Sequence, residues 1–194
     1  MVRPREFDRD EALERATHVF WAKGYAGTST EDLLAAMNIG RQSLYNAFGD
    51  KRKLYLEAMQ RYQLHSIAGH LARLSGGATV VAGLEALLFG IAPDHGPTRE
   101  LGCFGVNATC EFGNGDAELV ALRAKAAPML LKRVAQRIAE GQASGELDAK
   151  MEAREAAAFV LMTMQSLQLA ARAGTDVKTL RAMARFAIER IKAR

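Results

Sequence analysis

Five polar side chains within six consecutive positions have the chemistry needed to read the bases of a nucleic acid. Arginine and glutamine can each make paired hydrogen bonds to the edge of a base in the major groove of DNA, and serine, tyrosine and asparagine can bond to bases or phosphates. Leu44 and Phe48, four residues apart, would lie together on the opposite side of a helix. The segment is therefore predicted to be a short helix with a buried side and an open polar side. The polar residues are Arg41, Gln42, Ser43, Tyr45 and Asn46.

The residues before this helix predict a second short helix and a tight turn that would hold it in place. Ser29 and Asp32 have the spacing of a capping box, which marks the start of a helix. Asn38 suits the left-handed conformation just past a helix end, and Gly40 is acceptable as the next N-cap. Two short helices at a sharp turn form the motif that places a helix in the major groove of DNA. The stripe that the first helix would bury is Leu33, Leu34 and Met37.

The placement of charge, rather than its total, agrees with a surface that faces DNA. The 194-residue chain has a formal net charge of +4, but residues 1–60 carry nine basic and nine acidic side chains. Residues 39–61 carry five basic and two acidic side chains, so the positive excess is local. The further predicted DNA contacts are Thr28, Thr30 and Lys51, and of the DNA-binding residues Thr28, Tyr45 and Lys51 are expected to hold phosphates.

Residues 24–54 resemble, without a gap, the DNA-binding segment of the TetR (tetracycline-repressor) family of bacterial transcription regulators. Asn38 stands where the family usually has glycine, and asparagine also tolerates the left-handed region. Gln42 stands where a small residue is frequent in the family, and its amide can bond a base edge at two points. The residues that carry the resemblance are Gly24, Tyr25, Thr28, Ile39, Leu44, Tyr45, Phe48, Lys51 and Leu54.

The resemblance implies an all-α fold with an N-terminal three-helix helix-turn-helix DNA-binding domain at residues 1–52. Residues 53–194 would form a helical ligand-binding and dimerisation domain. The implied function is a DNA-binding transcriptional regulator that responds to an unknown small-molecule inducer or electrophile, most often a repressor that binds a palindromic operator as a homodimer. An activator with the same DNA-binding surface is one alternative. A helical interaction module without DNA binding is another, but it leaves the polar face of residues 41–46 unexplained.

Hydrophobic spacing predicts helices along the rest of the chain, with no alternating pattern typical of strands. Pro128 falls inside one of these helices, so a kink or a break is expected there. Glycine and proline clusters mark the breaks between helices. The predicted helices outside the helix-turn-helix segment span residues 8–23, 50–74, 80–91, 103–112, 116–140, 151–173 and 177–192.

The last two predicted helices carry enough apolar surface to join two chains. Between residues 156 and 169, apolar side chains occupy nearly every face of the helix, so it must be covered on more than one side. Two such helices from each of two chains would form a four-helix bundle. The alternative is a hairpin that packs only against its own core, and the family resemblance favours the dimer. The predicted interface residues are Phe159, Leu167, Leu180, Ala184, Ile188 and Ile191.

The predicted ligand-binding module, roughly residues 78–145, has a weaker sequence signal. Large apolar side chains could line a cavity and polar ones could orient a ligand, although such residues more often belong to a core. The candidates are Phe104, Phe159 and Met162 for the walls, and His65 and Asn107 for polar contacts.

Cys103 has two interpretations. Gly102, Cys103, Asn107 and Glu111 resemble a subgroup of the family that includes repressors sensing N-ethylmaleimide and other electrophiles, in which the cysteine after that glycine is the reactive group. A position near a helix start generally favours the thiolate, the reactive form of a cysteine. The alternative is a small buried residue. Cys110 is expected in the core, about 10.5 Å from Cys103 on one helix and thus too far away for a disulfide.

Other classes of function have little support in the sequence. No apolar run approaches the roughly 18 residues needed to span a bilayer, and the first 30 residues lack the apolar segment of a signal peptide, so a cytoplasmic location is expected. No cysteine or histidine spacing is typical of a metal site, and neither a metal nor a cofactor is predicted. An enzyme would need a nucleophile beside a base, and Cys103 with His65 or His95 is the only conceivable pair.

Overall fold

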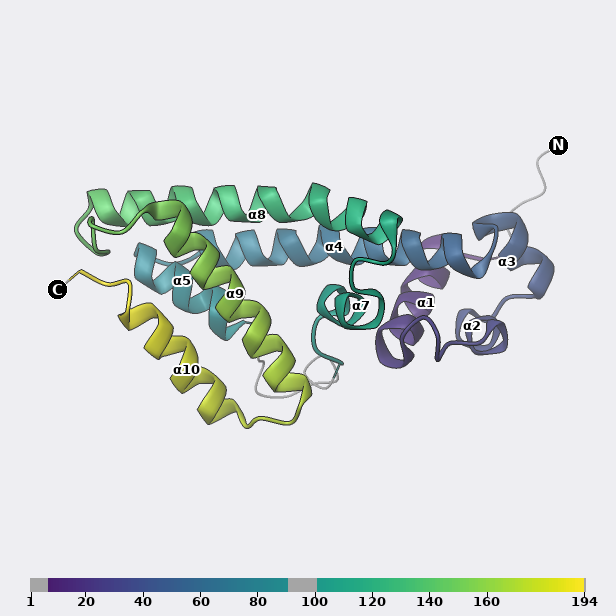
Figure 1. The fold of residues 1–194 in the computed structure, drawn as a ribbon. Helices are drawn as coiled ribbons and strands as arrows, with labels where there is room; N and C mark the ends of the chain where they lie inside the picture. The colour runs from purple at the N-terminus through teal and green to yellow at the C-terminus, as the bar shows by residue number, and fades with distance from the viewer. Residues whose placement is uncertain (1–6, 91–100, 194) are drawn as a thin grey trace.

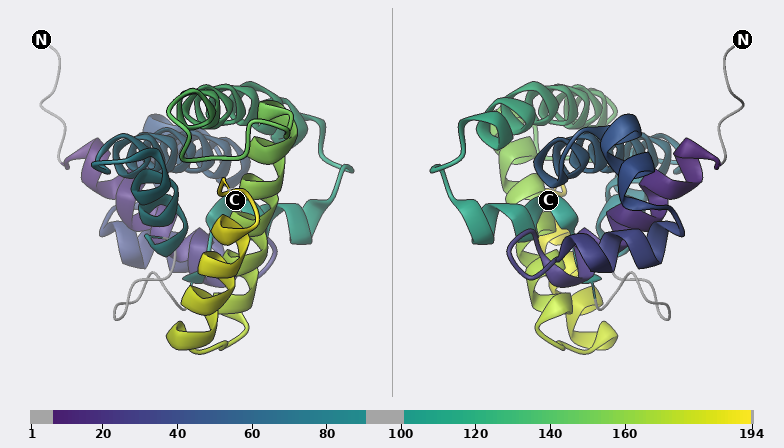
Figure 2. Two further views of the ribbon diagram at one scale, coloured as in Figure 1. Left: turned by 90° about the vertical axis from the view of Figure 1, so that its left-hand side faces the viewer. Right: turned by 90° about the vertical axis from the view of Figure 1, so that its right-hand side faces the viewer.

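The computed structural model describes residues 7–90 and 101–193, and the regular elements in these ranges are all α-helices. They are α1 (Arg9–Lys23), α2 (Thr30–Met37), α3 (Arg41–Phe48), α4 (Lys51–Ser75), α5 (Val80–Phe89), α7 (Phe104–Phe112), α8 (Ala117–Ala143), α9 (Ala153–Arg172) and α10 (Val177–Glu189). The long helices α4 and α8 lie side by side and run in the same direction (Figure 1). At one end α1 and α3 pack against α4, and α2 packs against α1. At the other end α5 and α9 pack against the long pair, and α10 packs against α5 and α9. Seen along the long axis, α9 and α10 lie together and project away from α4 and α8 (Figure 2).

The predicted helix-turn-helix is confirmed in its local detail. Ser29 accepts a hydrogen bond from the amide of Asp32, whose side chain accepts one from the amide of Ser29, so the capping box is complete. Lys23 pairs with the same carboxylate at 2.7 Å and, together with these bonds, lowers the pKa of Asp32 to about 2. Asn38 has φ 53° and ψ 47°, so the chain turns at the predicted left-handed residue, and Gly40 is the N-cap of α3.

Two hydrophobic cores divide the molecule along α4. The N-terminal core contains the buried residues of α1, α2 and α3, and those of α4 as far as Met59. The C-terminal core begins on α4 at Leu74 and includes the buried residues of α5, α9 and α10. Leu119 of α8 belongs to the N-terminal core and Leu130 of the same helix to the C-terminal core, so α8 connects the two halves. Phe104 of α7 belongs to the N-terminal core. The two cores meet within one continuous helix, between Met59 and Leu74.

The end of α4 and the start of α5 touch through their backbones. A Cβ atom on Gly83 would lie 2.3 Å from the carbonyl oxygen of Leu74, and one on Gly77 would lie 2.3 Å from the amide nitrogen of Gly83. These distances leave no space for a side chain at either glycine. The contact therefore fixes α5 directly against the end of α4.

Of the expected kink or break at Pro128, the break does not occur. The α8 helix continues through this residue from Ala117 to Ala143 (Figure 1). Proline removes one hydrogen bond from a helix, and the carbonyl that loses its donor here belongs to Ala124. Because Pro128 and Ala124 are both exposed, water can bond to that carbonyl.

The last helix is shorter than predicted, ending at Glu189. The residues that follow pair with a distant part of the chain. The amide of Asp148 donates to the carbonyl of Ile191 at 3.0 Å, and the amide of Ala193 donates to the carbonyl of Glu146 at 3.1 Å. Tertiary hydrogen bonds thus replace the last helical ones.

Candidate nucleic-acid interface and internal cavity

The α3 helix exposes its polar residues and buries its apolar ones. Leu44 and Phe48 lie in the N-terminal core and fix α3 against its neighbours. Tyr45, next to Leu44 in the sequence, is 45% exposed and marks the open side of the helix. The exposed residues of α3 are Arg41, Gln42, Tyr45 and Asn46, with Ser43 half-buried.

Hydrogen bonds organise these side chains in the unbound protein. Gln42 Nε2 donates to Asn46 Oδ1 across one helical turn, at 2.9 Å. Arg41 Nη2 pairs with Glu31 Oε1 of α2 at 2.5 Å, and both side chains are more than half exposed. An ion pair this exposed is weak. Arg41 can therefore exchange Glu31 for a base edge or a phosphate.

The other predicted DNA contacts lie in different environments. The ammonium group of Lys51, at the start of α4, lies 4.3 Å from the centre of the Tyr25 ring, a cation–π contact that orients it. Thr30 is the first residue of α2 and is half-buried. Thr28 is 1% exposed, and its hydroxyl donates to the Gly24 carbonyl at 2.6 Å. This corrects the expectation for Thr28, which shapes the turn before α2 and has almost no surface to offer a phosphate.

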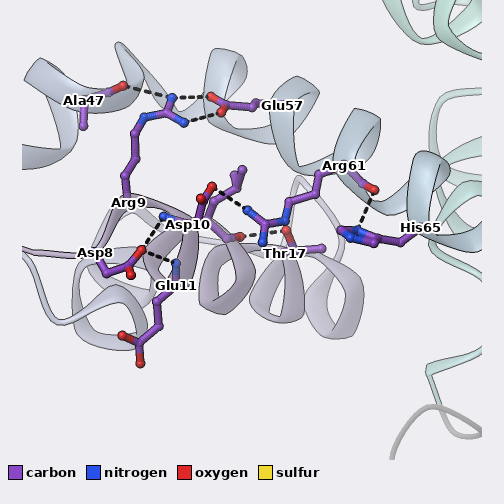
Figure 3. Close-up of polar contacts among 10 residues, drawn as sticks. Asp8, Arg9, Asp10, Glu11, Thr17, Ala47, Glu57, Arg61 and His65 are labelled. Carbon is purple, nitrogen blue, oxygen red and sulfur yellow. Dashed lines mark hydrogen bonds and ion pairs between the residues drawn. The ribbon is translucent and has the colours of Figure 1, made fainter.

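Arg9 joins three helices at the DNA-binding end (Figure 3). Its guanidinium donates to both carboxylate oxygens of Glu57 in α4, at 2.6 and 2.8 Å, and to the carbonyl of Ala47 in α3, at 3.2 Å. Arg61 of α4 donates to the Asp10 carboxylate of α1 at 2.9 Å. These contacts fix α3 relative to α4, so any movement of α4 carries α3 with it. The partners are 38 to 51 residues apart, and no local sequence pattern indicates them.

The α7 helix is attached to the turn between α1 and α2 through Glu111. Its carboxylate accepts hydrogen bonds from the amides of Tyr25, at 3.0 Å, and Ala26, at 2.8 Å. The Phe112 ring packs beside the Tyr25 ring, with their centres 5.8 Å apart. A displacement of α7 would therefore act directly on the helix-turn-helix. The sequence singles out Glu111 only as part of a motif and does not predict this contact.

Behind α7 lies a cavity of about 400 Å³, bounded by α4, α7, α8 and α9. Apolar side chains from these helices form much of its wall, and polar groups stand among them. Of the residues predicted to contact a ligand, Cys103 lines this cavity. The apolar lining includes Ile67, Val106, Leu130, Leu161 and Met164. The polar lining includes His70, Cys110, Arg123, Gln165 and Gln168.

The other residues predicted to contact a ligand lie elsewhere. His65 borders a second hollow on the far side of His70, and Asn107 is bonded to a backbone carbonyl at 2.9 Å. Phe104 is 1% exposed within the N-terminal core. Phe159 and Met162 lie on the outer surface of α9, 42% and 69% exposed. Helical spacing locates large apolar residues, but it does not say which side of each helix faces the cavity.

Cys103 is the N-cap residue of α7 and is half-buried in the cavity wall. Gly102 before it has φ 67°, and a Cβ atom there would lie 3.1 Å from Cβ of Arg172, so the turn favours glycine. Tyr62 lies half-buried beside this thiol: burial raises the pKa of Tyr62, and Cys103 adds to the shift. Cys110 is exposed and also borders the cavity, so its expected place in the core is wrong. Both thiols are free.

The apolar stripe predicted for the dimer interface faces the core of its own subunit. Leu180 and Ile188 are 2% and 0% exposed and have no surface left for a partner. Leu167, Ala184 and Ile191 are buried in the same core. A neighbouring face of α9 and α10 carries large apolar side chains that remain exposed. They are Phe159, Met162, Leu169, Met183 and Phe186.

Among residues 7–90 and 101–193, none of the helices combines the length and the apolar character that a membrane span requires. The same ranges hold no group of histidine, cysteine, aspartate and glutamate side chains that could bind a metal ion. His95, one of the two bases considered for Cys103, lies outside the described residues.

The exposed polar helix α3, held after a tight turn by α1 and α2, defines a helix-turn-helix DNA-binding protein. Comparison with known proteins gives the family. Residues 12–58 match the family model described as "Bacterial regulatory proteins, tetR family", and residues 90–187 match the one described as "Tetracyclin repressor-like, C-terminal domain". The chain belongs to the TetR family, whose members are transcriptional regulators and not enzymes.

Individual relatives agree with this assignment. The chain is 29% identical over 181 residues to the transcriptional repressor ComR of Escherichia coli (strain K12), a match that covers 92% of this chain and 86% of ComR. It is 37% identical over 120 residues to the uncharacterised regulator YezE of Bacillus subtilis (strain 168), covering 61% and 62% of the two chains.

Solved structures share the whole fold. A cysteine mutant of the TetR-family regulator CifR, in complex with 26-bp double-strand operator DNA, is 31% identical with a TM-score of 0.82 and covers 97% of this chain and 99% of its own. Escherichia coli NemR in its reduced form shares the fold at 17% identity, with a TM-score of 0.82 and coverage of 95% and 96%.

Proposed function

We propose that the protein is a cytoplasmic, homodimeric repressor whose affinity for a palindromic operator falls when its cavity is occupied or Cys103 is modified. The observation that carries this proposal is the double attachment of α7. One part of this short helix borders the cavity, beginning at its N-cap Cys103. Its other end holds the turn between α1 and α2 through Glu111. A change in the cavity can thus reach the DNA-binding surface through one rigid element.

In this proposal residues 1–52 form the DNA-binding domain, and residues 53–194 form the ligand-binding and dimerisation domain. Arg41 and Gln42 read bases, and the remaining exposed residues of α3, with Thr30 and Lys51, position the protein on the DNA. A single recognition helix contacts few base edges, whereas two copies about 34 to 36 Å apart read a palindrome. The structure of CifR in complex with operator DNA supports this part of the proposal.

The proposed dimer interface is the exposed apolar face of α9 and α10. Phe186 is 58% exposed and Met162 is 69% exposed in the single subunit, which is unfavourable for large apolar side chains gathered on one face. Pairing this face with its copy in a second subunit would bury them in a four-helix bundle. The interface therefore moves from the predicted stripe at Ile188 to the neighbouring face, and Phe159 remains in it.

A ligand or an adduct can release DNA only if it favours the released arrangement over the bound one. N-ethylmaleimide would place an adduct on the Cys103 sulfur, in the cavity wall at the start of α7. The adduct would displace α7, and with it the Glu111 contact to the helix-turn-helix.

The test is operator binding with and without alkylation, measured by fluorescence anisotropy on DNA from upstream of the gene. Wild type should bind in a salt-dependent manner and lose affinity by about tenfold or more after one adduct forms. Cys103→Ser should keep its affinity on treatment, and Cys110→Ser, the matched control, should lose it like wild type. If Cys103→Ser also loses the operator, the cysteine is a packing residue and the inducer binds without covalent chemistry.

An activator would use the same surface and pass the same binding test. A reporter gene behind the operator distinguishes the two roles. Deleting the regulator should raise expression from a repressed promoter, whereas loss of an activator would lower it.

A further inference from the structure

We propose that the cavity takes an amphipathic organic acid, with its apolar part between α7, α8 and α9 and its carboxylate against Arg73 of α4. The inference rests on the proposed ligand-binding role of the cavity and names the chemical class of ligand. Three features support it: a half-buried cation, a buried histidine in a fixed hydrogen-bonding state, and two hollows that share this histidine in their walls.

Arg73 is a half-buried cation with no carboxylate partner among the described residues. Its Nη2 donates to His70 Nδ1 at 2.8 Å, while its Nε is buried without a hydrogen-bond partner in the same part of the chain. The side chain lies flat on Gly90, where a Cβ atom would come within 2.2 Å of the arginine Cδ. Burial lowers the pKa of Arg73. Desolvating a cation is unfavourable unless a counter-charge compensates it, and an anionic ligand would supply one.

His70 is 6% exposed and fixes the orientation of this cation. Because arginine only donates, His70 Nδ1 must accept, and its Nε2 carries the proton and donates to Ser66 Oγ at 3.1 Å. Burial, with a further contribution from Arg73, lowers the pKa of His70 to about 4, so the imidazole is neutral at physiological pH. The positive charge at this place therefore belongs to Arg73.

Two hollows share His70 in their walls. The cavity of about 400 Å³ lies on one side, and a second hollow of about 370 Å³ lies on the other, with Arg73 and Trp21 in its wall. A ligand across the junction would place an apolar body against the aliphatic wall of the first and a polar head beside Arg73 in the second. The residues that border both hollows are Tyr62, Ser66, His70 and Gln168.

The charge favours a carboxylate over a phosphate as the head group. Among the described residues that line the second hollow, Arg73 carries the one permanent charge. A carboxylate balances it, whereas a phosphate monoester brings about two negative charges at neutral pH and would leave one uncompensated. A guanidinium also matches the two oxygens of a carboxylate geometrically.

Trp21 is the only tryptophan of the chain and provides the readout. It borders the second hollow, and its indole Nε1 donates to the Leu101 carbonyl at 3.1 Å. The experiment titrates full-length protein, without DNA, with decanoate and 4-phenylbutyrate and with the neutral amides of both acids. Tryptophan fluorescence should change at lower concentration with each acid than with its amide, by about tenfold.

Two arginines serve as a matched pair of variants. Arg73→Gln should weaken the acids about tenfold and leave the amides unchanged, and Arg73→Lys should lose less because it keeps the charge. Arg123 lines the opposite part of the first cavity, where it donates to the Thr109 hydroxyl and the Gly113 carbonyl. Arg123→Gln should leave the binding of both acids and amides unchanged. If Arg73→Gln fails to fold, the Arg73→Lys and Arg123→Gln titrations still decide where the charge is recognised.

Several outcomes would overturn the proposal. They are an equal affinity for acids and amides in wild type, an unchanged preference in folded Arg73→Gln, and a loss of preference in Arg123→Gln alone.

Operator binding separates this proposal from the proposed function. If an acid binds through Arg73 but leaves operator affinity unchanged, the anion site stands and ligand-controlled repression fails. If alkylation releases the operator while no acid binds preferentially, repression controlled from the cavity stands and the anion site fails.

Discussion

At the scale of single residues, we expect some side chains of the DNA-binding surface to select a base and others to bind the phosphate backbone of the DNA. Gln42→Ala should weaken operator binding by about 1 to 3 kcal/mol and relax discrimination at one base pair, because its amide lies exposed on α3. Lys51→Ala should weaken all sequences alike and lower the salt slope by about one. Titrations over a range of salt and operator variants measure both quantities. A change of base preference in Lys51→Ala, with none in Gln42→Ala, would reverse the assignment.

A second residue-scale prediction concerns the pH dependence of stability. Burial and Arg73 lower the pKa of His70 from 6.5 to about 4 in the folded protein. The unfolded chain therefore binds more protons between these values, and the folded state loses stability as the pH falls through this window. The contribution of His70 to the free energy of unfolding should drop by roughly 3 kcal/mol between about pH 7.5 and pH 4.

Denaturant titrations of wild type and His70→Gln test this prediction. The variant should show a weaker dependence on pH in the same window, because glutamine does not titrate. Identical slopes in the two proteins would mean that His70 is protonated as easily in the folded state as in the unfolded chain.

At the scale of elements, α7 should transmit changes through the Glu111 carboxylate. Glu111→Gln weakens the hydrogen bonds from the Tyr25 and Ala26 amides, which should then exchange hydrogen about tenfold faster. Operator loss after alkylation should also shrink. Glu118→Gln, which removes the same charge from an exposed pair with Arg52, is the control and should change neither measurement. Unchanged exchange in Glu111→Gln would show that the carboxylate does not hold this turn.

Elements also show where sequence reasoning succeeds and where it stops. The caps at Ser29 and Asn38 depend on residues three or four positions away, so they can be predicted to the residue. The contact of Glu111 with Tyr25 joins residues 86 positions apart, and no periodic pattern encodes it. On the last helix, the cleanest apolar stripe is the one that the subunit's own core requires. The face left for a partner is recognised only once that core is known.

At the scale of the whole molecule, two substitutions on one helix should separate assembly from folding. Phe186 is 58% exposed in the subunit and Ile188 is 0% exposed. Phe186→Asp should give a folded monomer with unchanged helix content and much weaker operator binding, because the charge disrupts only the proposed interface. Ile188→Asp should unfold the subunit, since a buried unpaired carboxylate costs several kcal/mol.

Analytical ultracentrifugation and circular dichroism measure the two outcomes. A dimeric Phe186→Asp would remove this face from the interface. A folded, dimeric Ile188→Asp would show that the last helix does not pack as described.

The backbone contact between Leu74 and Gly83 holds the C-terminal end of α4, so a tilt of this helix would pivot about that end. Along the helix, Ser66 in the cavity wall lies about 12 Å from Leu74, and Lys51 beside the DNA-binding helices lies about 35 Å from it. A tilt that moves α4 by about 1 Å at Ser66 therefore moves it by about 3 Å at Lys51. In a dimer, tilting both α4 helices would move the two recognition helices away from the spacing of about 34 Å that separates successive major grooves on one side of the DNA. The displacement is amplified about threefold, so a small occupant of the cavity would be enough to move the two recognition helices out of register with one operator.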